Sequence, residues 1–173
     1  MALAIDRAND KLAGHDSFGI VEDNRLSAKR AGGVAAQLPA ADDIEILENG
    51  IFVKYDEANG EVNFTGEGPW MMVFNEEKLY DSHKQMHRDY AMQKADALDG
   101  IITPRCLRLY AGDTYTTNTV KADSYEVGDK LVPGAKGELE KSADATTGLI
   151  LQVVKTYTLP DGQPAVKLMV ISE

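Results

Sequence analysis

Hydrophobic and polar residues alternate with a period of two over much of the chain after residue 44, which is typical of half-buried β-strands. The alternation is clearest around Asp161-Gly162, where Tyr157 and Leu159 come before the pair and three apolar positions follow it, namely Val166, Leu168 and Val170. An Asp-Gly pair between two such runs is typical of a tight hairpin turn. The sequence therefore predicts a C-terminal strand-turn-strand unit hinged on Asp161-Gly162.

A second hairpin is predicted at Asn49-Gly50. Ile44 and Ile46 alternate with polar residues before this pair, and Ile51, Val53 and Tyr55 alternate after it. Asn-Gly supplies the two positive-φ residues of a type I′ turn. A further Asn59-Gly60 pair precedes residues 62–64, so the pattern predicts a three-stranded meander, followed by a short buried strand in the run Trp70-Met-Met-Val-Phe74.

Residues 75–98 break the β pattern, since they hold few β-branched residues and their apolar positions fall loosely on a helical spacing. We expect a helix or a long loop excursion there, ended by Gly100 and Pro104. Short strands then resume at intervals of about 8 to 12 residues, which favours a small β-barrel or β-sandwich. The predicted strands lie at 106–110, 114–120, 130–132, 137–139, 149–159 and 164–171.

The first part of the chain, residues 1–41, is rich in Ala, Gly and Asp, and its apolar residues keep no sustained period. It is too apolar for a free linker and too aperiodic for a long helix. We expect an extended N-terminal arm that is ordered by lying on its own domain or on a neighbouring subunit. The predicted organisation is thus an arm at 1–41 and a β-rich domain at 42–173.

The net charge of −10 changes the picture of possible partners. An acidic chain repels polyphosphate, and no Lys/Arg cluster is present that would follow a nucleic-acid backbone or an anionic membrane. No segment approaches the roughly 18 continuous apolar residues of a membrane span, and the N-terminus has no basic region followed by an apolar core. We therefore expect no nucleic-acid partner, no membrane partner and no Sec-type export.

His83 and His87 are the only residues whose spacing resembles a metal site. They form an i, i+4 pair, flanked by Asp81 and Asp89, that would share one helical face. The zinc-hydrolase signature is not met, because Lys84 stands where a general-base Glu is required. The two histidines are weak metal candidates, and a polar segment without metal is the simpler interpretation.

Cys106, the single cysteine, excludes an intrachain disulfide and lies in the apolar run 106–110, where a small buried residue is expected. No local motif marks a serine or cysteine nucleophile. Carboxylates are plentiful, but their number alone does not define an acid/base pair. The sequence predicts no catalytic residue, no cofactor and no enzyme activity.

Three segments, together with Gly148 and Val153-Val154 between the second and the third, resemble a known family: Val127-Gly-Asp-Lys-Leu131, Lys136-Gly-Glu-Leu139, and Leu159-Pro-Asp-Gly-Gln-Pro-Ala-Val-Lys167. Their order, in which a Gly-Asp turn introduces a strand, a Gly-containing hairpin follows and an Asp-Gly-Gln hairpin closes the domain, is similar to that of the decoration or cement proteins of tailed-phage heads. These are small β-barrel or β-sandwich proteins bound to the outside of the capsid.

The resemblance implies a structural virion protein that binds the outer capsid surface and stabilises it by bridging capsomers. It implies the major capsid protein as partner, a homo-oligomer (dimer or trimer), and a place on the virion after assembly in the host cytoplasm. Arm residues would then be buried across the seam between capsid subunits. The capsid-contact candidates are Phe18, Ile20, Val21 and Leu26.

Two other functions stay open. One is a receptor- or glycan-binding virion module, of a head fibre or the tail, in which Trp70, Tyr80 and Tyr90 form an exposed aromatic platform; Trp70 in the core is the competing interpretation. The other is a small metal-dependent hydrolase that uses His83 and His87.

Overall fold

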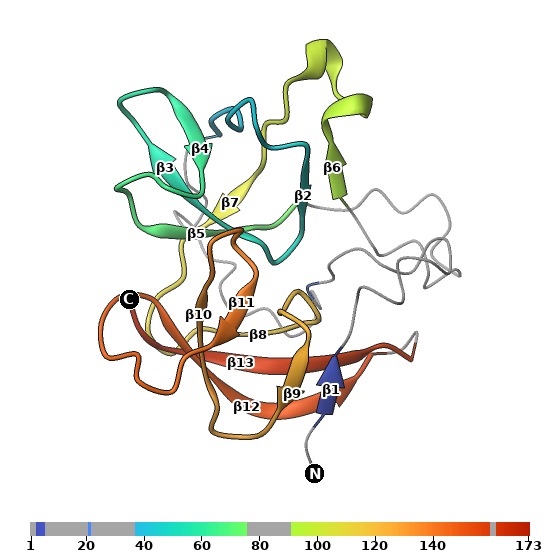
Figure 1. Cartoon of the computed structure of the whole chain (residues 1–173), viewed down its shortest axis with the longest axis vertical. Helices are drawn as coiled ribbons and strands as arrows, with labels where there is room; N and C mark the ends of the chain where they lie inside the picture. Colours follow the sequence, from blue (N-terminus) through green and yellow to red (C-terminus); the bar gives the residue numbers. More distant parts are fainter. Residues whose placement is uncertain (1–2, 6–20, 22–36, 76–90, 160–161) are drawn as a thin grey trace.

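The computed structural model describes residues 3–5, 21, 37–75, 91–159 and 162–173 (Figure 1). The described part of the chain is mainly β, as predicted, and it includes two short 3-10 helices, η4 (Lys94–Asp96) and η5 (Leu98–Gly100). The strands are β1 (Leu3–Ile5), β2 (Ile46–Glu48), β3 (Phe52–Asp56), β4 (Glu61–Asn63), β5 (Trp70–Val73), β6 (Ala91–Gln93), β7 (Cys106–Leu107), β8 (Thr114–Thr117), β9 (Asp123–Tyr125), β10 (Lys130–Pro133), β11 (Leu139–Lys141), β12 (Ile150–Thr158) and β13 (Pro164–Ser172).

The largest sheet has five antiparallel strands in the order β11-β10-β12-β13-β8 and forms the lower half of Figure 1. Its longest pair is β12–β13, which confirms the predicted C-terminal hairpin. At the hairpin end Gly162 has φ +91°, and the Leu159 amide donates to the Gln163 carbonyl at 2.7 Å. Asp161 lies outside the described residues.

A four-stranded sheet in the order β4-β3-β5-β7 lies above the first (Figure 1). Successive residues of its strands point to opposite faces, so Phe52, Met72 and Leu107 pack against the five-stranded sheet. The first hydrophobic core lies between these two sheets and includes Tyr115 and Leu151. The two open sheets packed face to face make the fold a sandwich, so of the two predicted classes the β-sandwich fits rather than the barrel.

The other face of the four-stranded sheet is also buried. Val53 of β3, Val73 of β5 and Cys106 of β7 enter a second core, which is closed by Leu47 of β2 and by Ile102. A strand buried on both faces carries apolar residues at consecutive positions rather than in alternation. This explains why the run at 70–74 is apolar throughout.

The predicted hairpin at Asn49-Gly50 is wrong in its pairing. β2 pairs with β6, whereas β3 lies between β4 and β5, so the chain changes sheets at this turn. The Asn49 side chain is 1% exposed and takes the place of a strand neighbour, since its Nδ2 donates to the Asn75 carbonyl at 3.2 Å and its Oδ1 accepts from the Asn75 amide at 2.8 Å. By contrast, the predicted turn at Asn59-Gly60 does join paired strands, β3 and β4.

The described end of the 75–98 excursion contains no α-helix: it forms β6, η4 and the start of η5, while 76–90 lie outside the described residues. Within the described residues, no helix has the length and apolar character needed to cross a membrane.

The described parts of the predicted arm pair with the chain's own domain. β1 is antiparallel to β9, Val21 bridges Thr117 of β8, and Ala40 bridges Val62 of β4. These contacts cover outer edges of both main sheets, and exposed strand edges are sites of unwanted pairing. Residues 6–20 and 22–36 lie outside the described residues.

Candidate functional site

The histidine pair does not fall within the described residues, so His83 and His87 as weak metal ligands stay a prediction, as do Asp81 and Asp89. Across residues 3–5, 21, 37–75, 91–159 and 162–173, no three His, Cys, Asp or Glu side chains gather in a way that could hold a metal ion. The described part of the molecule therefore adds no second candidate for a metal centre.

Cys106 lies in the second core with a fully buried side chain, as the sequence predicted. Burial raises the pKa of this thiol to about 12, against a smaller lowering by its hydrogen bond with Tyr55. The pKa of Tyr55 is raised as well, first by burial and then by Cys106. Because the thiolate is the reactive form, a thiol with so high a pKa is not a nucleophile near neutral pH.

Of the four capsid-contact candidates, the structure describes only Val21. This side chain is 5% exposed and belongs to the first core, where it lies beside the strand that carries Thr117. A side chain buried in its own core has almost no surface left for a partner, so Val21 does not fit the contact role. Phe18, Ile20 and Leu26 lie outside the described residues and remain predictions.

The aromatic platform of the receptor-binding alternative is described only at Trp70. This indole is half-buried against the first core, and the Lys54 ammonium lies 4.9 Å from its ring centroid. Its packing against the core and its contact with the lysine both reduce the ring surface open to a ligand. Tyr80 and Tyr90 lie outside the described residues.

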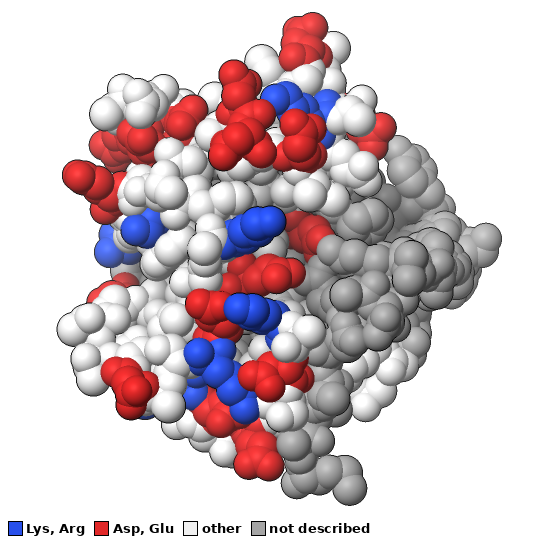
Figure 2. Space-filling model, in the orientation of Figure 1, with Lys and Arg blue, Asp and Glu red and all other residues white. Residues whose placement is uncertain are grey.

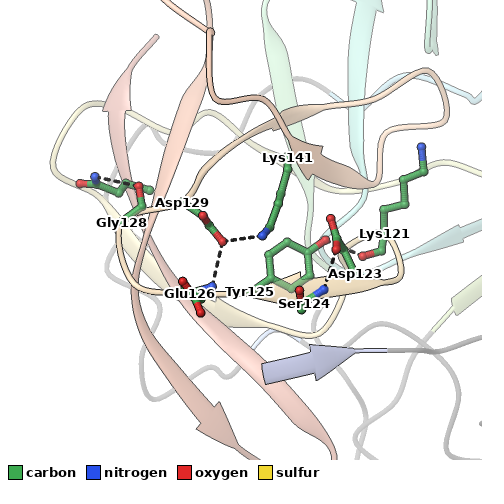
Figure 3. Close-up of polar contacts among 9 residues, drawn as sticks. Lys121, Asp123, Ser124, Tyr125, Glu126, Gly128, Asp129 and Lys141 are labelled. Atoms are coloured by element: carbon green, nitrogen blue, oxygen red, sulfur yellow. Dashed lines mark hydrogen bonds and ion pairs between the residues drawn. The ribbon is translucent and has the colours of Figure 1, made fainter. Parts of the chain in front are cut away.

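The Gly-Asp turn of the resemblance forms a closed corner between β9 and β10 (Figure 3). The Asp129 carboxylate accepts a hydrogen bond from the Glu126 amide at 2.8 Å and forms an ion pair with the Lys141 ammonium at 2.8 Å. Gly128 has φ +99°, a conformation that favours glycine, and its amide donates to the Val153 carbonyl at 2.8 Å. The corner is thereby attached to β12.

Asp129 and Lys141 form the ion pair at the centre of this corner. The Lys141 ammonium also lies 5.4 Å from the ring centroid of Tyr125, whose hydroxyl donates to the Lys121 carbonyl (Figure 3). Burial pushes the pKa of Asp129 up, but the hydrogen bonds from Lys141 and from the Glu126 amide outweigh it and bring the pKa below its usual value. The carboxylate is therefore held ionised, which suits a structural clamp rather than a proton donor.

A groove of about 790 Å³ lies between β2, β4 and the turn that joins β10 to β11. Apolar side chains line it, among them Ile44, Ile46, Ile51 and Phe64. Its charged residues are five acidic ones, with Lys136 as the single basic residue; the acidic residues are Asp43, Glu45, Glu48, Glu61 and Glu138.

Figure 2 shows the same asymmetry on a larger scale. Acidic side chains predominate over the upper part of this face, around β2, β3 and β4, whereas acidic and basic side chains alternate lower down, over β10 and β11. The groove thus combines apolar surface with an excess of acidic residues.

Sequence reasoning on the acidic residues of 42–61 alone favours a solvated face that aids solubility. It missed the groove, because the groove is made by segments far apart in the sequence, 41–51, 61–65 and 135–138. The signal that was present is the alternation of acidic and apolar residues at Asp43-Ile-Glu-Ile46.

Comparison of the chain with protein-family models, with curated proteins and with solved structures returned no match.

Proposed function

We propose that this chain is a structural virion protein that binds the outer surface of a phage capsid and stabilises it by bridging capsomers, with the major capsid protein as partner. It acts by binding and catalyses no reaction. It works as a homo-oligomer, dimer or trimer, on virions assembled in the host cytoplasm.

The observation that supports this proposal is that the three segments of the family resemblance fold into one unit. The 127–131 turn leads into β10, the 136–139 segment into β11, and the 159–167 segment closes β12 onto β13, all within the five-stranded sheet. The 127–131 turn is joined to β12 by two hydrogen bonds. The Gly128 amide donates to the Val153 carbonyl at 2.8 Å, and the Val153 amide donates to the Asp129 carbonyl at 2.9 Å.

A stripped-shell experiment tests the proposal. Phage heads depleted of this protein are mixed with purified chain, sedimented, and heated while DNA release is followed by a dye. We expect the chain to co-sediment with the shells and to raise the temperature of DNA release, because a bridging subunit resists internal pressure on every seam it covers. No co-sedimentation, or an unchanged release temperature, rejects the proposal.

The segment after β6 and the β9–β10 corner lie toward opposite ends of the long axis (Figure 1), and each carries an exposed apolar residue that serves as a matched variant. Leu98 in η5 is 87% exposed, and Val127 at the β9–β10 corner is 67% exposed. If the protein contacts the shell through one end only, Asp in place of the apolar residue at that end abolishes shell binding. Asp at the opposite end leaves shell binding unchanged. Equal effects of Leu98→Asp and Val127→Asp would contradict a one-ended contact.

A further inference from the structure

β2 has one edge that carries no strand within the described part of the chain. It pairs with β6 alone, on one side, and faces the β3–β4 hairpin across the groove on the other (Figure 1). The Lys94 amide donates to the Glu45 carbonyl at 2.9 Å, which marks positions 45 and 94 as a hydrogen-bonded pair. Such pairs alternate in antiparallel sheets, so the backbone N–H and C=O of Ile46 point away from β6.

This edge differs from the outer edges of β11 and β4 in the two main sheets. Val120 bridges the outer edge of β11, and Ala40 bridges that of β4. Proteins cover or shorten strand edges because an open one pairs with another chain. The β2 edge is instead open among the described residues, and its residue Ile46 is 42% exposed.

The groove beside the edge supplies both side-chain contacts and a charge preference. Ile44, Ile51 and Phe64 offer apolar surface, and Glu45 and Glu61 stand on opposite sides of the groove, before β2 and in β4. Asp43, Glu45 and Glu61 against Lys136 favour a cationic occupant.

We propose that this groove binds an extended segment of a partner protein, bearing alternating lysine or arginine and apolar side chains, which adds as a strand to β2. Main-chain hydrogen bonds to Ile46 give affinity, and the carboxylates and apolar residues of the groove give specificity. β2 has three residues, so it contacts about 10 Å of the incoming chain at about 3.4 Å per residue. The inference goes beyond the proposed function and does not rest on it, since it is tested without capsids.

The primary test uses fluorescent eight-residue peptides and the intact chain, with binding followed by fluorescence anisotropy at low and near-physiological salt. An alternating Lys-Val peptide is expected to bind, and more weakly as salt rises, whereas its Glu-Val counterpart is not. A Lys-Val peptide methylated on alternate backbone nitrogens is expected to lose most of its affinity. Equal binding of the Lys-Val and Glu-Val peptides, or of the methylated and unmethylated forms, overturns the proposal.

Charge variants of the protein test whether the peptide binds in the groove. Combining Glu45→Gln with Glu61→Gln is expected to weaken Lys-Val binding by about 2- to 25-fold, since each exposed ion pair contributes about 1.4- to 5-fold. The matched control combines Glu126→Gln with Asp144→Asn, which removes the same charge from exposed positions outside the groove. Equal losses in the two double variants would mean that net charge, not the groove, attracts the peptide.

Backbone variants test the strand pairing. Ile46→Pro removes an N–H that does not bond to β6, so β2 keeps its partner, while an added strand loses a donor. Ile46→Val keeps the N–H and most of the side chain. Binding that falls with Pro and persists with Val supports the proposal, provided that both variants keep the wild-type melting temperature within a few degrees; binding that survives Pro contradicts strand addition.

Two other occupants are distinguished in the same assay. Spermine that competes as strongly as the peptide at equal charge would show a site for polycations without strand pairing. A peptide of residues 22–36, which carries Arg25, Lys29 and Arg30, tests a second copy of this chain. Tighter binding of that peptide than of the Lys-Val peptide would replace the partner protein by a second copy and overturn the proposal.

Discussion

The two sheets of the sandwich were assembled in different ways. In the five-stranded sheet, β10 to β13 are consecutive in the chain, the long β12–β13 hairpin is the most extensive pairing, and β8 alone joins from a distant part of the chain. In the four-stranded sheet, β5 pairs with β7 although residues 75–105 separate them in the chain. The second face of this sheet is covered by β2 and β6, which are also far apart in the chain and pair with each other. Local pairing needs only a turn, whereas distant pairing needs the rest of the fold.

This difference also separates the roles of the two regions. At the β9–β10 corner, which leads into the larger sheet, Asp129 is paired within the chain with Lys141. The groove beside the smaller sheet has an excess of one charge and an open strand edge. Regular local structure thus provides the frame, and the irregular junction carries the surface suited to a partner.

The largest effect is expected from Gly137→Ala, which acts on the joint between the two sheets. The Phe52 amide donates to the Gly137 carbonyl at 2.9 Å, and a β-carbon on Gly137 would lie 2.0 Å from the Phe52 carbonyl oxygen. A left-handed alanine costs about 1–2 kcal/mol and overpacking about 1–3 more, so the free energy of unfolding should fall by about 2–5 kcal/mol. Urea unfolding measures this.

Gly148→Ala is the control for that variant. Gly148 also has a positive φ, +79°, but a β-carbon there would meet nothing within 4 Å. Only the backbone cost of about 1–2 kcal/mol is expected. If both alanine variants lose equal stability, the Gly137 contact does not hold the sheets together.

The next prediction concerns the loss of stability on truncating a methionine on either face of β5. Met72 is buried in the first core and Met71, beside it, in the second. Truncating either to Ala should cost about 2–5 kcal/mol, because a cavity forms in a packed core. Since both cores share the four-stranded sheet, each variant should unfold in one transition by both circular dichroism and Trp70 fluorescence. Separate transitions in Met71→Ala would show that the second core is an independent unit.

A smaller effect is expected at the β9–β10 corner from Asp129→Asn. The native pKa of Asp129 is lowered, so its charge stabilises the fold above the unfolded pKa of about 3.9, and this contribution disappears as pH falls through the native pKa. The carboxylate is partly exposed, so we expect a difference from wild type of less than about 1 kcal/mol at pH 7. Urea unfolding from pH 7 to pH 2 should show the two proteins converging in acid; a difference that stays constant with pH would exclude the charge as its cause.

The smallest effect is expected for chemical labelling of the Cys106 thiol, which should be almost absent in the native protein. Cys106 is buried in the second core and burial raises its pKa to about 12, so a disulfide reagent should leave the native protein unlabelled at pH 8. Labelling should follow global unfolding, with the chain in concentrated urea as the fully reactive control. Labelling much faster than the unfolding equilibrium allows would reveal local opening of the second core.

The strands that sequence predicted correctly are those whose alternation and turn lie together, such as β12 with β13 and β3 with β4. The mistake at Asn49-Gly50 has a definite cause. The turn residues are of the hairpin type, but Asn49 uses its side chain to bind the backbone of Asn75, and a β-carbon on Gly50 would lie 2.9 Å or less from the hydroxyl oxygens of Thr117 and Thr119. Asn75, Thr117 and Thr119 are all distant from this turn in the sequence, so no local pattern predicts these contacts.

By itself, the sequence determined the β class, the C-terminal hairpin and the buried state of Cys106, because period-two patterning, turn chemistry and apolar runs act over a few residues. Only the tertiary structure decided which strands are neighbours, that one sheet is buried on both faces, and that residues 41–51, 61–65 and 135–138 enclose an acidic groove. These features depend on contacts between segments distant in the chain, which are settled by the packing of the whole molecule.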